Sequence, residues 1–151
     1  MLREKDLSPE IYRKLARKVA QICQEQEQQL ILNTTPAVAA QLGVGKLHLP
    51  MSILRSEGRP QKAEYVGTSV HSVNEVKEAL ELGADYLFAG NIYETDCKKG
   101  LPGRGLDFLS QVCMESSVPV YAIGGVNEER LPEILSTGAA GGCMMSGFMK
   151  L

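Results

Sequence analysis

One short unit recurs along the chain and constrains its fold more than any other feature. A stretch with helical periodicity ends at a glycine, and a short apolar run follows it, at residues 40–49, 80–88 and 135–145. Glycine ends a helix without strain because it adopts the left-handed conformation. A continuous apolar run is typical of a strand buried in a parallel sheet. The repeated unit therefore predicts an all-parallel α/β sheet.

The same pattern, followed from end to end, predicts seven strands with six helical segments between them in one domain, residues 1–151. The predicted strands are residues 2–4, 29–32, 46–49, 65–67, 86–89, 119–123 and 142–145. The first strand begins close to residue 1 and no helix-length segment follows the last one, whereas an eight-stranded barrel usually needs about 250 residues. We therefore expect an α/β fold of the TIM (β/α) barrel type that lacks the first βα unit and the last helix, or an open α/β sheet.

Two helix starts are marked by capping residues. Ser8 precedes a proline, as an N-cap does before a proline in the first turn, and Ser72 with Glu75 forms an S-x-x-E capping box. Helical spacing predicts which side chains of the first helix face the core. They are Ile11, Leu15, Val19, Ile22 and Cys23.

Charge and cysteine usage narrow the class of protein. The formal net charge is −2, so no basic excess favours nucleic acid as a partner. No apolar run is long enough to span a membrane, and the charged N-terminus lacks the apolar core of a signal peptide. The four cysteines have neither zinc-site nor C-x-x-C spacing. We expect a cytoplasmic protein with reduced thiols that binds neither nucleic acid nor membrane.

Polar residues gather just after the predicted strands, where a parallel barrel places its active site. Gly124-Gly125 and Ser146-Gly147 follow the last two strands, and barrels often bind phosphate there through backbone N–H groups. Simple turn glycines are the alternative explanation. Arg3 and Lys5 follow the first strand and could bind a second anion, unless they form only a solvated charged loop.

Two further features carry potential chemistry. Lys98 lies in the glycine-rich loop 97–105, which is either a lid or anion clamp or an exposed connection. His71 lies beside Ser69 and could move a proton near neutral pH, or it could make a structural hydrogen bond to a neighbouring loop. For His48, the other histidine, the structural explanation is the stronger one.

Several blocks resemble one family in the right order. They are L-R-E-K-D at residues 2–6, G-T-S-V-H-S at 67–72, A-I-G-G-V at 122–126 and M-S-G at 145–147. Together they resemble the thiamine phosphate synthase/TenI superfamily over essentially the whole chain. The resemblance implies a TIM barrel, a role in thiamine biosynthesis and a small phosphorylated thiazole as ligand.

Two branches share this fold. The synthase condenses hydroxymethylpyrimidine diphosphate with thiazole phosphate, using magnesium, whereas TenI aromatises a thiazole phosphate by proton transfer. Residues 93–101, Y-E-T-D-C-K-K-G-L, resemble the corresponding TenI loop. Synthases carry aspartates where this chain has Asn33-Thr34 and residues 50–53, and magnesium prefers such carboxylates. The resemblance therefore favours a TenI-like thiazole tautomerase without a cofactor, with magnesium required only if the chain is a synthase.

The residue patterns and the resemblance together imply a set of site residues and no metal ligand. His71, Ser69 and Lys98 are the expected catalytic residues. The expected phosphate ligands are Gly124, Gly125, Met145 and Ser146, and the expected substrate or anion ligands are Arg3, Lys5, Asn33, Asn91 and Thr95.

Asn91 departs from the family, because TenI proteins have a histidine there and an amide cannot shuttle a proton. His71 is then the remaining candidate base. A residual synthase and a non-catalytic phosphate-ligand binder or regulator remain alternatives. An open barrel edge would also invite self-association.

Overall fold

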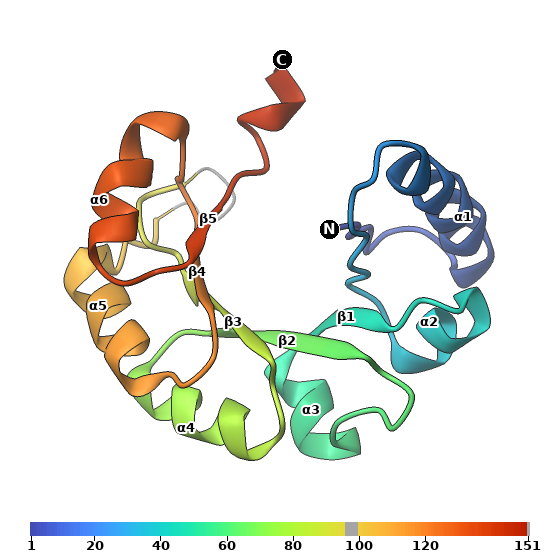
Figure 1. The fold of residues 1–151 in the computed structure, drawn as a ribbon, viewed down its shortest axis with the longest axis horizontal. Helices are drawn as coiled ribbons and strands as arrows, with labels where there is room; N and C mark the ends of the chain where they lie inside the picture. The colour runs from blue at the N-terminus through green and yellow to red at the C-terminus, as the bar shows by residue number, and fades with distance from the viewer. Residues whose placement is uncertain (96–99, 151) are drawn as a thin grey trace. The chain divides into compact units, whose positions relative to one another are not determined.

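The structure is a computed structural model that describes residues 1–95 and 100–150, with helices and strands alternating from α2 to β5 (Figure 1). The helices are α1 (Pro9–Glu25), α2 (Pro36–Leu42), α3 (Met51–Glu57), α4 (Val73–Glu81), α5 (Gly105–Glu115) and α6 (Leu131–Ser136), with 3-10 turns η2 (Glu128–Arg130) and η3 (Phe148–Lys150). The strands are β1 (Lys46–Leu49), β2 (Tyr65–Val70), β3 (Tyr86–Gly90), β4 (Val120–Ile123) and β5 (Gly141–Cys143).

The strands form one sheet in the order in which they occur along the chain, β1-β2-β3-β4-β5. β3 pairs with β4 and β4 with β5, both in parallel, with Gly90 opposite Ile123 and Ile123 opposite Cys143. The predicted α/β fold with a parallel sheet is thereby confirmed, while closure into a barrel stays a prediction. β5 begins one residue earlier and ends two residues earlier than the pattern predicts, so Met145 lies beyond the sheet.

The chain divides into two compact units, Met1–Gly67 and Thr68–Leu151, with the boundary inside β2. In the first unit, the strands predicted at residues 2–4 and 29–32 occur as single parallel bridges, from Leu2 to Leu32 and from Leu32 to Leu47. The N–H of Leu2 donates to Ile31 and the N–H of Asn33 donates to Leu2, both at 2.9 Å. Both segments pair as predicted, but each is shorter than the apolar pattern suggests.

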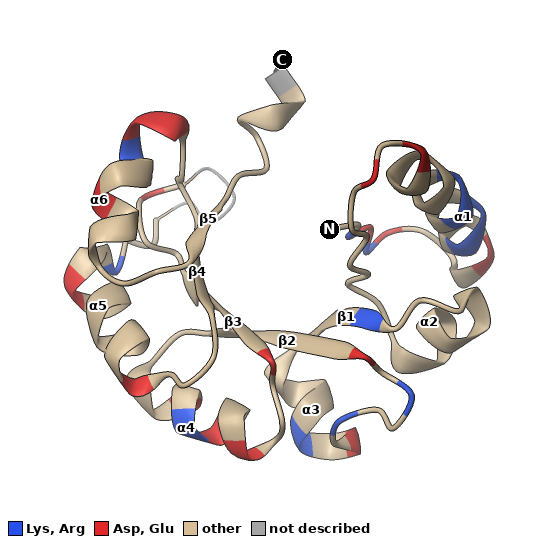
Figure 2. Ribbon diagram, in the orientation of Figure 1, with Lys and Arg blue, Asp and Glu red and all other residues tan. Residues whose placement is uncertain are grey.

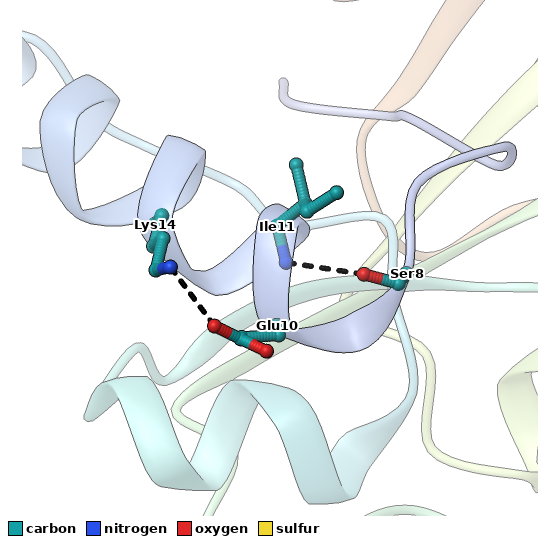
Figure 3. A network of polar contacts seen from close by, with 4 residues as sticks. All are labelled: Ser8, Glu10, Ile11 and Lys14. Carbon is teal, nitrogen blue, oxygen red and sulfur yellow. Dashed lines mark hydrogen bonds and ion pairs between the residues drawn. The ribbon is translucent and has the colours of Figure 1, made fainter.

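Helix α1 begins as predicted but turns a different face to the core. The Ser8 hydroxyl accepts a hydrogen bond from the Ile11 N–H at 3.4 Å, and an exposed Lys14–Glu10 pair follows (Figure 3). The buried residues are Tyr12 and Ala16, whereas Ile11 is half exposed. The predicted inward face was therefore wrong at Ile11 and at Ile22, which is also exposed. Tyr12 can occupy the buried position although it carries a polar group, because its hydroxyl donates to the Leu2 carbonyl at 3.3 Å.

The core of the second unit is built on β3, which is buried along its whole length. The rings of Tyr86, Phe88 and Tyr121 pack edge to face with centroids 5.5–6.2 Å apart, an arrangement that aromatic pairs prefer. In this unit, Figure 2 places charged residues on the helices and loops, and β3 and β4 contain none. This apolar layer fixes the two strands whose carboxyl ends lead into the candidate site.

Helix α4 is capped by Ser72 as the motif predicts, whereas the return bond of the capping box goes to the residue before Ser72. The Ser72 hydroxyl accepts from the Glu75 N–H at 3.3 Å, and the Glu75 carboxylate accepts from the His71 N–H at 2.5 Å. We expect Ser72→Ala to lower the free energy of unfolding by about 1 kcal/mol, because it leaves an N-terminal helix donor unpaired. Urea denaturation measures the change. Ser72→Asp keeps an acceptor and should stay close to the wild type; equal losses in both variants would contradict the capping role.

No helix in the part of the chain that the structure describes is long and apolar enough to cross a membrane.

Candidate functional site

The loops that follow β3, β4 and β5 start at neighbouring positions in the second unit. These strands are parallel and in register, with Gly90, Ile123 and Cys143 aligned. Asn91, Gly124 and Met144 are therefore the first residues of adjacent loops at the carboxyl edge of the sheet. In parallel α/β proteins this edge is where ligands bind.

Two of these loops are packed tightly against each other. A Cβ atom on Gly124 would lie 2.5 Å from the Cβ of Asn91, and one on Gly125 would lie 2.6 Å from the Glu94 carbonyl oxygen. Both glycines have left-handed backbone angles, φ +93° and φ +66°. The N–H of Tyr93 also donates to the Gly124 carbonyl at 3.1 Å. The close approach of the two loops therefore requires glycine at both positions, which the sequence pattern does not reveal.

The same turn presents unpaired hydrogen-bond donors. The carbonyl of Gly124 accepts from Tyr93, and the carbonyl of Gly125 accepts from the Arg130 guanidinium. Within residues 1–95 and 100–150, the N–H groups of Gly124, Gly125 and Val126 have no hydrogen-bond partner. Backbone N–H groups away from the exposed surface are normally paired. This turn can therefore accept an anion without losing any bond that the fold already makes.

The second half of the predicted phosphate set follows the neighbouring strand. Met145 and Ser146 come just after β5 and are exposed. Because Ile123 and Cys143 are in register, they emerge beside the Gly124-Gly125 turn. The structure thus brings the two predicted halves to adjacent strand ends, and phosphate binding itself stays a prediction.

His71 makes the contact that defines its tautomer. Its Nδ1 lies 2.6 Å from the Gly90 carbonyl oxygen at the end of β3. A carbonyl oxygen can only accept, so Nδ1 must carry the proton and Nε2 keeps its lone pair when the ring is neutral. The ring is exposed, and Ser69 lies two residues earlier on β2. His71 therefore makes the structural bond that the sequence left open and still presents a base.

Asn91 acts as a brace between loops. It is buried, and its Nδ2 donates to the Tyr93 carbonyl at 3.2 Å and to the Pro102 carbonyl at 3.5 Å. The N–H of Arg104 donates to the Asn91 carbonyl at 2.9 Å. These bonds explain an asparagine here without a ligand, and substrate contact by Asn91 stays a prediction. Thr95 is half-buried, and Lys98 lies outside the described residues.

The remaining predicted ligands belong to the first unit. Arg3 and Lys5 are exposed, and Asn33 is half-buried beside the Leu2–Leu32 bridge. The structure describes these residues within their own unit, so their part in a shared site stays a prediction. Among the described residues, no three His, Cys, Asp or Glu side chains gather as a metal site would require.

His48 is a buried core histidine on β1, with only 4% of its surface exposed. Burial, and secondarily the charge of Arg3, lowers the pKa of His48 to about 4. An unfolded histidine titrates near 6.5, so between these values the unfolded chain binds more protons. Stability should therefore fall as the pH drops from about 6.5 towards 4, by roughly 2 kcal/mol at pH 5.

Urea unfolding at pH 7 and pH 5 tests this expectation. His48→Gln should be less stable than the wild type at pH 7, because it disturbs a packed site, but should lose less stability between the two pH values. An unchanged pH dependence in His48→Gln would show that other groups cause it.

Fold and site together define a parallel α/β protein with backbone N–H groups in the turn after β4 that have no partner among the described residues. The thiamine monophosphate synthase family model matches residues 1–148. "Thiamine-phosphate synthase 2" of Streptococcus pneumoniae is 33% identical over 154 residues, which span 99% of this chain and 72% of that protein. The chain therefore belongs to the thiamine monophosphate synthase/TenI family, as the sequence blocks predicted.

Other comparisons agree with this assignment. "Thiamine-phosphate synthase" of Enterococcus faecalis is 34% identical over 153 residues, covering 98% of this chain and 71% of that protein. The solved "Thiamine phosphate pyrophosphorylase from Pyrococcus furiosus" superimposes with a TM-score of 0.82 at 26% identity, over 98% of this chain and 72% of that one. FabK from Thermotoga maritima, at 17% identity and a TM-score of 0.71, shares the fold alone.

Family membership supports a role in thiamine biosynthesis. The relatives named above are synthases, and none of these comparisons specifically supports the TenI tautomerase branch. These comparisons therefore do not establish whether the chain catalyses the synthase or the tautomerase reaction.

Proposed function

We propose that this chain is an enzyme of thiamine biosynthesis whose second unit binds the phosphate of a thiazole phosphate. One observation carries the proposal: the N–H groups of Gly124, Gly125 and Val126 have no partner among the described residues and lie beside the loop that begins after β5. A phosphate presents several acceptor oxygens, and glycine-rich turns at strand ends bind such groups through their amides.

Thiamine phosphate synthesis is the activity that the names of the relatives support. In that reaction, hydroxymethylpyrimidine diphosphate condenses with thiazole phosphate, and magnesium neutralises the diphosphate. The residues of this chain do not fit a dedicated magnesium site. Asn33-Thr34 and Pro50 to Ile53 stand where the resemblance places aspartates, and no carboxylate-rich cluster replaces them among the described residues.

Thiazole tautomerisation is the second candidate, favoured by His71. Its Nδ1 is held by the Gly90 carbonyl, and this leaves Nε2 able to take a proton from the thiazole ring. A neighbouring acid would return a proton to the exocyclic carbon, so the reaction needs no cofactor. Ser69 and Lys98 are the residues that the sequence suggests for this assistance.

The purified chain distinguishes these activities in two parallel assays. One supplies thiazole phosphate, the pyrimidine diphosphate and magnesium, and measures thiamine phosphate. The other follows aromatisation of the non-aromatic thiazole phosphate by NMR. Product in the first assay assigns the synthase reaction, and product in the second assigns the tautomerase reaction.

Calorimetry with thiazole phosphate tests the proposal that both activities share. Tight binding without turnover in either assay would leave a non-catalytic phosphate-ligand binder. Absence of binding would overturn the proposed function. The unphosphorylated thiazole alcohol is the matched control and should bind more weakly, because it lacks the group that the amides hold.

A further inference from the structure

Arg130 makes two contacts with the loops of the proposed phosphate site. Its guanidinium donates a hydrogen bond to the Gly125 carbonyl, and it lies over the ring of Tyr93 with 4.2 Å from Cζ to the ring centroid. Its backbone N–H donates to the Asn127 side chain at 3.0 Å, which fixes the turn η2 from which it extends. Arg130 therefore links the loop after β3 to the loop after β4.

Tyr93 is itself held in place. Its hydroxyl donates to the Glu133 carboxylate. The Tyr93 ring thus has the Glu133 carboxylate at its edge and the Arg130 guanidinium over its face. A cation over the face of an aromatic ring is attracted to it. Tyr93, Arg130 and Glu133 therefore form a cluster that contacts the Gly124-Gly125 turn.

The bond to the Gly125 carbonyl has a consequence for the next amide. A trans peptide unit is planar, and its C=O and N–H point in opposite directions. Anchoring the Gly125 carbonyl on Arg130 therefore fixes the direction of the Val126 N–H. In the same way, the bond from Tyr93 to the Gly124 carbonyl fixes the Gly125 N–H. Both oriented N–H groups are among those without a partner in the described parts of the chain.

The turn needs this external support because it contains two consecutive glycines. Glycine has no side chain to restrict its backbone angles, so the peptide units on either side of Gly125 can rotate once their carbonyls are released. Arginine suits the task because its planar guanidinium can stack on a ring while donating a bond in its own plane. A lysine ammonium offers the charge without that geometry.

We propose that Arg130 is a positioning residue for phosphate recognition, acting through the Gly125–Val126 peptide, and that the Val126 N–H is one of the donors. This inference rests on the proposed function, since it names how that site is organised. A positioning role of Arg130 and a role of its charge alone can be distinguished, because they predict different behaviour of a lysine variant.

The test compares two ligands by calorimetry in the wild type, Arg130→Met and Arg130→Lys. We expect both variants to bind thiazole phosphate roughly tenfold more weakly, as loss of one oriented donor would cause, and to bind the thiazole alcohol as the wild type does. Arg59→Lys is the matched control. Arg59 also donates to backbone carbonyls, of Ala63 and Glu64, but in the first unit, and its variant should bind both ligands normally.

Three outcomes would overturn the inference. Unchanged thiazole phosphate affinity in both variants removes Arg130 from recognition, and equal loss for the two ligands indicates a merely structural role. Full rescue by lysine shows that charge, not orientation, matters. If the wild type itself binds no thiazole phosphate, the proposed function is wrong. In the three outcomes above the wild type still binds thiazole phosphate, so failure of the inference can be told apart from failure of the proposed function.

A second pair of variants covers the case in which Arg130→Met does not fold. Tyr93→Leu removes the ring under the guanidinium, whereas Tyr93→Phe keeps it. Selective loss of thiazole phosphate binding in Tyr93→Leu but not in Tyr93→Phe supports the inference, and equal binding by the two contradicts it.

Discussion

Gly124→Ala is expected to lower the free energy of unfolding by about 3 kcal/mol. The backbone at Gly124 has φ +93°, where an L side chain is strained at a cost of order 1–3 kcal/mol. The new methyl group would also lie 2.5 Å from the Cβ of Asn91 and 2.8 Å from its Cα. Asn91 is buried and braced to two carbonyls, so the loop cannot move away easily. Urea denaturation measures the loss.

Gly138→Ala separates the two causes of this effect. Gly138 has nearly the same angle, φ +91°, but its nearest neighbour would be the Cβ of Cys113 at 3.5 Å, an ordinary contact. Only the backbone cost remains there, about 1–2 kcal/mol. Equal destabilisation by the two variants would show that the packing of the loops against each other contributes nothing.

The sheet could be predicted from the sequence most closely where a strand is buried on both faces, as β3 is and β1 nearly is. The run at residues 86–89 is entirely apolar and became the central strand β3, and residues 46–49 became β1 with the predicted bounds. The length of the first two strands was predicted wrongly, because residues 2–4 and 29–32 pair only through one residue each, Leu2 and Leu32. The apolar pattern reports burial, whereas the number of paired residues depends on the neighbouring strand.

The face of α1 was predicted less well because tyrosine is ambiguous in a hydrophobic pattern. Counting Ile11 and Ile22 as core residues rotates the helix, whereas the structure buries Tyr12 and Ala16. The hydroxyl of Tyr12 can enter the interior because it donates to the Leu2 carbonyl. That partner lies ten residues away and belongs to another element, so local periodicity cannot identify it.

The candidate site, like the fold, could be predicted from the sequence only in part. The rule that parallel strands present chemistry at their carboxyl ends predicts Gly124 and Gly125 beside the loop after β5; the two strands do end side by side, and phosphate binding there stays a prediction. It did not identify Arg130 or Tyr93, because their contacts with the turn are tertiary: they come from η2 and from the loop after β3. The only signal in the sequence was the tyrosine itself, which lies four residues after the strand predicted at residues 86–89.

His71→Ala should reduce kcat/KM for thiazole aromatisation by about 10²–10⁴-fold, if the chain is a tautomerase, because general base assistance is lost. The bond from Nδ1 to the Gly90 carbonyl leaves Nε2 as the proton acceptor. Affinity for thiazole phosphate should change little, since in the proposed site the phosphate is held by backbone amides of another loop. The NMR assay and calorimetry measure the two quantities separately.

His71→Asn distinguishes proton transfer from support of the loop. An asparagine amide can donate to the Gly90 carbonyl as Nδ1 does, but it has no basic nitrogen in place of Nε2. If His71 is the base, His71→Asn should be as slow as His71→Ala. Recovery of turnover in His71→Asn would assign His71 to positioning alone. Unchanged turnover in both variants would remove it from the mechanism, and the synthase reaction, which the names of the relatives support, would then be the better explanation of the site.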